Sequence, residues 1–355
     1  SRGRHGTQKT SGSYTTQLSL AEGDDVLEAV SRGTFGTSVV ITEATAGLTS
    51  ITTTTSTIVA SAGSWITAAV KVGEIYRLTG HATAANNSKN LVVTGVTAST
   101  ITVAGTPLVA DAVADTAFTL TRHGRKLILP AAGAITQRYF TIEEHEVDID
   151  GSQVFTDCVW SRMRYSMQPN GIVMVDRDWV GTGQFETKTA GSAPHFTSPA
   201  ESTGLPMSVA DAALYVNGTA VVDLTAFDLT FDIKATAPDT FGSAAARYAP
   251  DVFTGQAAVS LNITALRKDL TFITDFNAET QYSLIAVAVD STAAAAGYHM
   301  IYVPNFTLGG VDTSALSKDG GARTVTLQVP EALVGKDDTG TPFDATMIKW
   351  AISNA

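Results

Sequence analysis

The chain has 355 residues, of which 44% are hydrophobic and 16% charged, and its formal net charge is −11. This length predicts two or three domains. The acidic balance disfavours tight binding of nucleic acid, because contacts of Lys and Arg with phosphate supply most nonspecific affinity. The single cysteine, Cys158, excludes an internal disulfide framework and a multi-cysteine zinc site, and in a predicted strand it is expected to be a buried, inert thiol.

The first predicted elements are a strand and a short acidic helix within residues 11–33. Residues 24–32 place Val26, Leu27 and Val30 on one helical face, and two aspartates at the N-terminal end suit the helix macrodipole. No secretion signal opens the chain, and no run approaches roughly 18 consecutive apolar residues, so membrane insertion is not expected.

The composition changes between residues 36 and 138. This stretch opens with a run of Thr, Ser and Ala at residues 49–61 and continues as short apolar runs separated by turn residues. Strands are predicted at residues 64–70, 75–79, 91–96, 100–103 and 117–121. They predict a small all-β sandwich or barrel, which as an insertion should have its own core and lie outside its host domain.

Tight turns divide the rest of the chain. Asp-Gly at 150–151 and Asn-Gly at 217–218 predict hairpins, because a type I′ turn needs positive φ at both central residues. Residues 228–233 alternate apolar and polar side chains, residues 268–277 form a second predicted helix, and residues 181–206 are rich in Gly, Ser, Thr and Pro. Other strands are predicted at residues 141–149, 154–165, 172–175, 213–216, 220–224, 258–265, 284–289, 299–303, 324–329 and 347–352.

The same plan occurs twice along the chain. Residues 11–33 correspond to residues 255–277, and the strand at 154–165 is matched to residues 298–308. The first copy lacks a counterpart of residues 224–235, so residues are expected to be missing before its first strand. The predicted domains are residues 1–38 with 129–185 (first), 39–128 (inserted), 186–206 (linker) and 207–355 (second).

Acidic residues are densest at the end of the strand predicted at 141–149. Glu144, Glu146, Asp148 and Asp150 fall on one face if the alternation continues. A solvated or channel-lining face is favoured over a cation site or a carboxylate pair for acid–base chemistry. The run lacks the downstream Glu of a calcium-binding loop and is interpreted as leading into a turn.

Other chemistry-bearing residues form no recognisable catalytic or metal-binding motif. The six histidines lack metal-ligand spacing, and no nucleophile elbow or phosphate loop occurs. The basic run at residues 122–126 is either a nucleic-acid contact or, as we favour, a polar junction between domains. Arg162 and Arg164 share one strand face, which is either simply exposed or makes ion pairs with another subunit.

Several segments resemble the major tail tube proteins of long-tailed, siphovirus-type bacteriophages. They are residues 10–20 (TSGSYTTQLSL), 24–35 (DDVLEAVSRGTF), 224–233 (LTAFDLTFDI), 250–255 (PDVFTG) and 264–280. The inserted VGEIYRLTG at residues 72–80, with Asn86 and Asn87, resembles an accessory module of such proteins. The resemblance covers most of the chain.

The resemblance implies a mainly β structural protein of the virion, with two tandem tube-type β-sandwich or barrel domains, each flanked by a short helix. Family subunits join edge to edge into rings, and the rings stack into a tube for genome passage. Since rings usually contain six tube domains, two domains per chain predict a homotrimeric, pseudo-hexameric ring; a homohexamer is the alternative. The inserted β-domain would decorate the exterior.

Further expectations follow from the same resemblance. Partners would be the tape measure protein, the tail terminator and distal tail proteins, with transient, non-adhesive passage of DNA. The protein would be assembled in the host bacterial cytoplasm and reside in the phage tail, with no cofactor, metal or catalytic activity. Glu144, Glu146, Asp148 and Asp150 are candidate lining residues of the channel, and Arg162 and Arg164 are candidate inter-subunit contacts.

Two other functional classes fit parts of the sequence. A β-rich adhesin or carbohydrate-binding module would use the insertion to recognise its ligand, although the missing secretion signal and disulfides argue against it. A β-fold hydrolase would need a nucleophile and a base, and no such set can be named.

Overall fold

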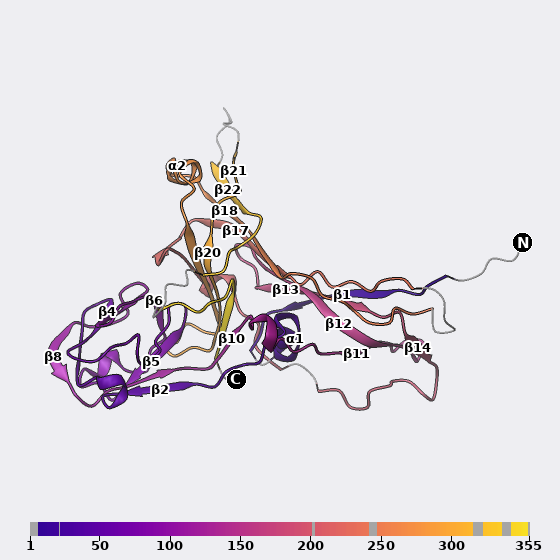
Figure 1. The fold of residues 1–355 in the computed structure, drawn as a ribbon, viewed down its shortest axis with the longest axis horizontal. Coiled ribbons are helices and arrows are strands. Elements are labelled where there is room, and N and C mark those ends of the chain that lie inside the picture. The colour runs from indigo at the N-terminus through magenta and orange to yellow at the C-terminus, as the bar shows by residue number, and fades with distance from the viewer. Residues whose placement is uncertain are drawn as a thin grey trace, which may run out of the picture.

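Three antiparallel β-sheets make up the computed structural model of the chain (Figure 1), which confirms the mainly β fold expected from the sequence. The structure describes residues 6–20, 22–200, 203–240, 247–314, 322–335 and 342–353. Helix in this part of the chain is limited to α1 (Asp24–Ser31), α2 (Thr271–Asn277) and the 3₁₀ turns Thr45–Gly47, Ala84–Asn86, Ala132–Ala134 and Val209–Asp211. None of these described helices is long and apolar enough to cross a membrane.

The largest sheet has nine strands. Its main path runs in the order β1 (Thr10–Gln17), β13 (Met174–Gly181), β12 (Gly151–Met167), β17 (Leu224–Asp232), β18 (Ala258–Leu266), β22 (Thr324–Val329), β21 (Gly310–Thr313). The first half of β12 also pairs with β11 (Phe140–Glu146) and β14 (Phe185–Lys188). Figure 1 shows β1, β11, β12 and β14 extending together to one side as an arm, while β17, β18, β21 and β22 rise from the centre.

Two further sheets stack beside the first. The six-stranded sheet runs in the order β10 (Arg125–Ile128), β23 (Lys349–Ile352), β20 (Tyr298–Phe306), β19 (Tyr282–Val289), β15 (Ala213–Val216), β16 (Thr219–Ala220). The eight-stranded sheet runs in the order β2 (Val39–Thr42), β9 (Thr119–Arg122), β5 (Ile75–Thr79), β6 (Leu91–Val96), β7 (Thr100–Val103), β4 (Thr57–Ala60), β3 (Ile51–Thr53), β8 (Asp111–Asp115). All eight of its strands come from the predicted insertion.

A first hydrophobic core joins the nine-stranded sheet to the six-stranded sheet. Leu229 and Phe231 of β17 and Val303 of β20 are fully buried in it. The rings of Phe231 and Trp350 meet edge to face, with centroids 5.4 Å apart and planes inclined by 77°. The two sheets therefore form a sandwich, and Leu27 and Val30 of α1 close one end of its core.

A second core lies on the other side of the six-stranded sheet. It combines side chains of the insertion with Tyr298, Met300 and Tyr302 of β20, while Ile301 and Val303 of the same strand face the first core. Alternate residues of β20 thus enter different cores, which explains why nearly every residue of this strand is buried. The insertion was expected to have its own core, and it shares that core with its host instead.

The nine-stranded sheet contains two sets of strands with the same connectivity. In each set the first strand runs into a helix: β1 precedes α1 and β18 precedes α2. In each set a later pair of consecutive strands returns, β12 and β13 or β21 and β22, and the second strand of the pair lies beside the first strand of the set. The orders β1-β13-β12 and β18-β22-β21 therefore correspond strand for strand.

Some expected elements differ from the observed ones. The predicted match between residues 154–165 and 298–308 is wrong, because β12 lies in the nine-stranded sheet and β20 in the six-stranded sheet. Residues 64–70 form no strand: Trp65 is fully buried within a series of turns that includes Ala69 at φ 62°. Helix α2 begins at Thr271, three residues later than predicted.

We expect Phe231→Ala to lower the free energy of unfolding by about 3–5 kcal/mol, because it leaves a cavity beside Trp350 in the first core. Phe253→Ala is the matched control, since this side chain is 54% exposed and its loss should cost less than about 1 kcal/mol. Urea unfolding of both variants measures the difference. Equal losses would contradict the assignment of Phe231 to the core.

Candidate functional site

The nine-stranded sheet has one buried face and one polar face. Its strands alternate between buried and more exposed side chains, because the core covers only one side. Cross-strand pairing aligns the uncovered residues in rows across the sheet. We call this surface the polar face, and it consists of Ser13, Thr15, Arg162, Arg164, Ser166, Asp176, Asp178, Asp228, Thr230, Asp232, Ser260, Asn262, Thr264, Thr326 and Gln328.

The charged residues of the polar face are four aspartates and two arginines, and Asp312 of β21, opposite Thr326, adds a fifth aspartate at its border. Arg162 lies 2.5 Å from Asp178, measured from guanidinium nitrogen to carboxylate oxygen. Arg164 donates to Asp228 at 2.7 Å and 3.1 Å and lies 3.7 Å from Asp176. Both cations are therefore neutralised within the chain, and the polar face keeps a negative excess.

The structure places both arginines singled out in the sequence on this face. The side chains of Arg162 and Arg164 are 47% and 45% exposed, and each is paired with aspartates of its own chain. Exposed pairs of this kind add little stability, so their main effect is to cancel charge. A contact of either arginine with another subunit remains a prediction.

The aspartates of this face are functional candidates that were not predicted from the sequence. Asp228 and Asp232 occupy the polar positions of the alternating run at residues 228–233, and Asp176 and Asp178 alternate in the same way along β13. The pattern that could have revealed them is the polar half of the alternation, that is, the residues between the apolar ones. Only the register, which pairs Arg162 with Asp178 and Asp232, shows that these residues share one surface.

The acidic run lies elsewhere, on the arm. Glu144 and Glu146 belong to β11, but the strand ends at Glu146, and Asp148 and Asp150 fall in the turn that follows. The four carboxylates are exposed and do not share one strand face, so that expectation is wrong. The alternation in sequence is misleading because Val147 and Ile149 are exposed turn residues, at 79% and 67%.

The predicted linker is fixed to the same arm. The carboxylate of Glu143 accepts backbone N–H bonds from His195 at 2.6 Å and Phe196 at 2.9 Å. Desolvation opposes ionisation, but the nearby hydroxyl of Ser152 and the hydrogen bonds from these two backbone groups lower the pKa of Glu143 to about 2. The carboxylate therefore stays charged at neutral pH and holds the linker against β11.

Five charged side chains meet where the insertion joins the sandwich. We call them the junction cluster: Glu74, Arg122, Lys126, Asp344 and Lys349. Glu74, which is fully buried, lies 2.9 Å from Lys126 and 3.2 Å from Arg122. Asp344 lies 2.7 Å from the buried Lys349 and 3.1 Å from Lys126. Lys126 therefore bridges the two carboxylates.

Backbone and aromatic groups complete the junction cluster. Lys349 donates to the carbonyl oxygen of Val72 at 2.6 Å, and its ammonium lies 5.2 Å from the centroid of the Tyr302 ring. The hydroxyl of Tyr76 donates to Glu74 at 2.8 Å. The insertion and the six-stranded sheet are thus joined by charge-assisted hydrogen bonds as well as by the second core.

The charged groups of the junction cluster shift each other's pKa values. Burial raises the pKa of Glu74, but the cations of Lys349, Lys126 and Arg122 outweigh that effect and hold the pKa below its usual range. Burial likewise raises the pKa of Asp344, and Lys349 and Lys126 lower it to about 2. Both carboxylates are therefore ionised at neutral pH.

The basic run at residues 122–126 is part of the same junction. Arg122 and Lys126 contact Glu74, whereas Arg125 lies 2.5 Å from Asp24 of α1 and 4.8 Å from the centroid of the Phe35 ring. These paired cations leave little charge for phosphate. The geometry thus agrees with the polar junction favoured from the sequence.

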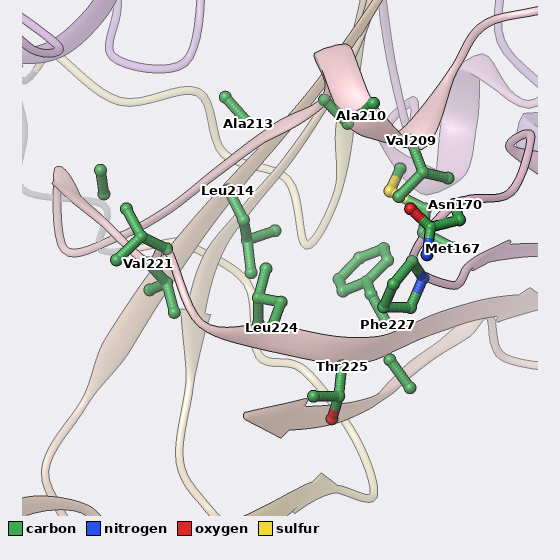
Figure 2. Close-up of a pocket in the computed structure, with 15 residues that line it drawn as sticks. Met167, Asn170, Val209, Ala210, Ala213, Leu214, Val221, Leu224, Thr225 and Phe227 are labelled. Atoms are coloured by element: carbon green, nitrogen blue, oxygen red, sulfur yellow. The ribbon is translucent and has the colours of Figure 1, made fainter. Parts of the chain in front are cut away.

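An apolar pocket of about 450 Å³ opens beside β17 (Figure 2). It is lined by side chains such as Met167, Val209, Leu214, Val221 and Phe227. The full set of lining residues contains no carboxylate, imidazole, thiol or amine side chain. The pocket therefore offers no group for acid–base or nucleophilic chemistry.

The buried side chains of Cys158 and His299 are held in their neutral forms. Burial raises the pKa of the Cys158 thiol to about 12, and desolvation together with nearby Arg177 lowers the pKa of His299 to about 3. Neither a thiolate nor an imidazolium forms at these positions near neutral pH. The described residues also contain no group of three or more His, Cys, Asp or Glu side chains arranged to hold a metal ion.

A family model described as phage tail tube protein matches residues 1–338. The chain belongs to this family of phage tail tube proteins. It is a structural protein of the virion tail, and the adhesin alternative is not favoured. No curated protein sequence matches the chain. The candidate site of a tail tube protein is an extended surface rather than a catalytic cleft, and the polar face is the surface of that kind described above.

We expect Glu74→Gln to destabilise the tail tube protein by about 3 kcal/mol, because it leaves three buried or half-buried cations facing a single carboxylate. Glu144→Gln, at an exposed position on the arm, should cost less than about 0.5 kcal/mol. Thermal and urea unfolding measure both values. A loss below 1 kcal/mol for Glu74→Gln would show that the junction cluster adds no net stability.

The pKa of Asp344 predicts a loss of stability in acid. Its folded-state pKa of about 2 lies below the ordinary value of 3.8, so its contribution is present above about pH 4 and is lost as the pH falls towards 2. Asp344→Asn removes this contribution. We therefore expect the difference in unfolding free energy between the wild type and this variant to shrink between about pH 4 and pH 2. A difference that does not depend on pH would contradict the assignment.

Proposed function

We propose that three copies of this chain form a ring with pseudo-sixfold symmetry, that such rings stack into the tail tube, and that the polar face lines the bore. The two corresponding sets of strands, β1-β13-β12 and β18-β22-β21, support this reading because they lie side by side in one sheet. Two tube domains per chain and six per ring require three chains. A homohexamer is the alternative.

The proposed assignment of an inner and an outer surface of the tube rests on the order of the layers. The polar face is backed by the nine-stranded sheet, then by the first core and the six-stranded sheet, then by the second core and the insertion. A polar face turned to the bore therefore puts the insertion on the exterior of the tube. A closed ring also leaves no lateral sheet edge exposed to aggregation.

The charge of the polar face suits a conduit for DNA. Its arginines are engaged by Asp178, Asp176 and Asp228, so the bore presents a negative surface with few free cations. Phosphate groups gain little from such a wall, and DNA can pass without adhering. The tape measure protein would occupy the same bore before ejection, and the tail terminator and distal tail proteins would contact the two ends of a tube assembled in the host cytoplasm.

The acidic residues of the arm hold a secondary place in this proposal. Glu144 and Glu146 lie on β11, which pairs with the first half of β12, and Asp148 and Asp150 lie in the turn that follows it. Their carboxylates would extend the negative surface at one end of each ring. The main wall is assigned to the aspartates of the polar face.

Labelling of introduced cysteines tests which surface faces the bore. Ser260→Cys lies on the polar face, and Val113→Cys lies on β8 of the insertion, where the side chain is 75% exposed. In unassembled protein a bulky polymer maleimide should modify both positions, while the buried Cys158 stays unmodified. In assembled tubes we expect Val113→Cys to react as before and Ser260→Cys to be protected at least tenfold.

Cryo-microscopy of the same tubes counts the chains in a ring. Three chains support the proposal, and six chains overturn the pseudo-hexamer. Protection of Val113→Cys together with free labelling of Ser260→Cys would reverse the assignment of inside and outside.

A further inference from the structure

The apolar pocket beside β17 lies between the end of β12 and the hairpin formed by β15 and β16. Figure 2 shows Leu214, Val221, Leu224 and Phe227 around this space of about 450 Å³. Val222, another lining residue, is 80% exposed. A surface pocket of this size whose lining carries no charge is typical of a site that takes an apolar group.

A second exposed apolar feature lies at the other end of β12. Residues 147–150, which we call the arm turn, connect β11 to β12, and in this turn Val147 and Ile149 are 79% and 67% exposed. The strand begins at Gly151, next to the arm turn, and ends at Met167, which lines the pocket. Its 17 residues span up to roughly 55 Å. The arm turn therefore cannot reach the pocket of its own chain.

Carboxylates surround the arm turn. The side chains concerned are exposed and make no ion pair with any residue that the structure describes: Glu144, Glu146, Asp148 and Asp150. The arm turn is thus an apolar tip surrounded by negative charge that its own chain does not neutralise.

Two arginines lie beside the pocket. Arg267 directly follows β18, whose end pairs with β17 close to Leu224 of the pocket, and its backbone N–H donates to the carbonyl oxygen of Arg323 at 2.7 Å. Neither guanidinium has an ion pair within the described part of the chain, whereas neighbouring Lys268 and Asp223 pair with each other. The pocket and the arm turn therefore carry unneutralised charges of opposite sign.

We propose that the pocket is the receptor for the arm turn of a second copy of this chain, which inserts Val147 and Ile149 and brings its carboxylates to Arg267 and Arg323. Apolar and charge complementarity together select this occupant. The contact is heterologous, so it repeats in one direction and leaves the polar face uncovered. This inference rests on the proposed function, and it names the site through which one ring of the stack holds the next.

The same contact gives the two ends of a stack different chemistry. One end leaves its pockets empty, and the other leaves its arm turns unbound. A protein that closes the first end must present branched aliphatic side chains beside carboxylates. A protein that closes the second end must present an apolar cavity beside cations.

Charge introduced at the arm turn tests the apolar part of the contact. The double variant Val147→Asp with Ile149→Asp changes only exposed side chains, so we expect the melting temperature of the unassembled protein to match the wild type. The mass of stacked tubes, measured by sedimentation and electron microscopy, should fall at least tenfold because charge would have to enter the pocket. Val113→Asp, at a similarly exposed valine of the insertion, should stack like the wild type.

Exchange of charges tests the electrostatic part and separates it from a loss of folding. Arg267→Glu with Arg323→Glu should lower the yield of stacked tubes at least fivefold, because like charges then face each other. Adding Glu146→Lys and Asp148→Lys to the same chain should restore the yield to within twofold of the wild type. Absence of any rescue would contradict the pairing of these two groups.

Crosslinking identifies the two surfaces directly. Ile149→Cys on the arm turn and Val222→Cys at the pocket are combined in one chain and treated with a short bismaleimide under assembly conditions, while Cys158 stays buried. We expect a ladder of covalent multimers in denaturing electrophoresis. A mixture of the two single-cysteine variants should give dimers only, since each chain then has one reactive end.

The outcomes separate this inference from the proposed function. If the wild type forms stacked rings and the Val147 and Ile149 double variant stacks equally well, or the cysteine pair gives no crosslink in intact tubes, the pocket is not the receptor and the proposed function stands. Single rings that no longer stack in the double variant support the inference. If the wild type forms no rings, the proposed function is wrong, and this inference falls with it.

Discussion

Burial of the six-stranded sheet on both faces is the constraint on which the rest of this structure depends. Strand β20 sends Ile301 and Val303 into one core and Met300 and Tyr302 into the other, so neither face of the sheet's central strands is left for solvent. The outer surfaces of the molecule must then come from the layers on either side. One is the polar face of the nine-stranded sheet, and the other is the insertion. This three-layer arrangement leaves two opposite outer surfaces, of which we propose that the polar face meets the bore.

Charged side chains, together with the second core, hold the insertion to the six-stranded sheet. Lys349 is completely buried, and its cost of desolvation is offset by Asp344, by the carbonyl of Val72 and by the face of Tyr302. Since these partners come from the insertion as well as from the host, the two cannot shift relative to each other without uncovering an ammonium group. The insertion is therefore a fixed layer of the tail tube protein, although its strands are continuous in sequence.

Local patterns in the sequence predicted local structure well. The apolar spacing at residues 24–32 gave α1, and the change of composition after residue 36 located a set of short strands. Long-range pairing was not predictable, because nothing near Lys349 signals that its ammonium donates to the carbonyl oxygen of Val72, far away in the chain. The prediction that the acidic run shares one strand face was wrong for a related reason. Apolar and acidic residues keep alternating through Val147 and Ile149, where the backbone has already left the strand and forms a turn. The polar face could be recognised only from the register of six strands.

The shared second core also bears on how such a protein can be modified. Because Tyr298, Met300 and Tyr302 rely on the inserted strands for cover, the whole insertion is a poor unit for exchange, even though one continuous segment encodes it. Its outermost strand is different: Val113 on β8 is largely exposed and lies at the edge of the eight-stranded sheet, far from the junction in strand order. With the insertion on the exterior of the tube, as we propose, peptide tags or display cargo grafted there would decorate the particle at regular intervals while the layers beneath keep their packing.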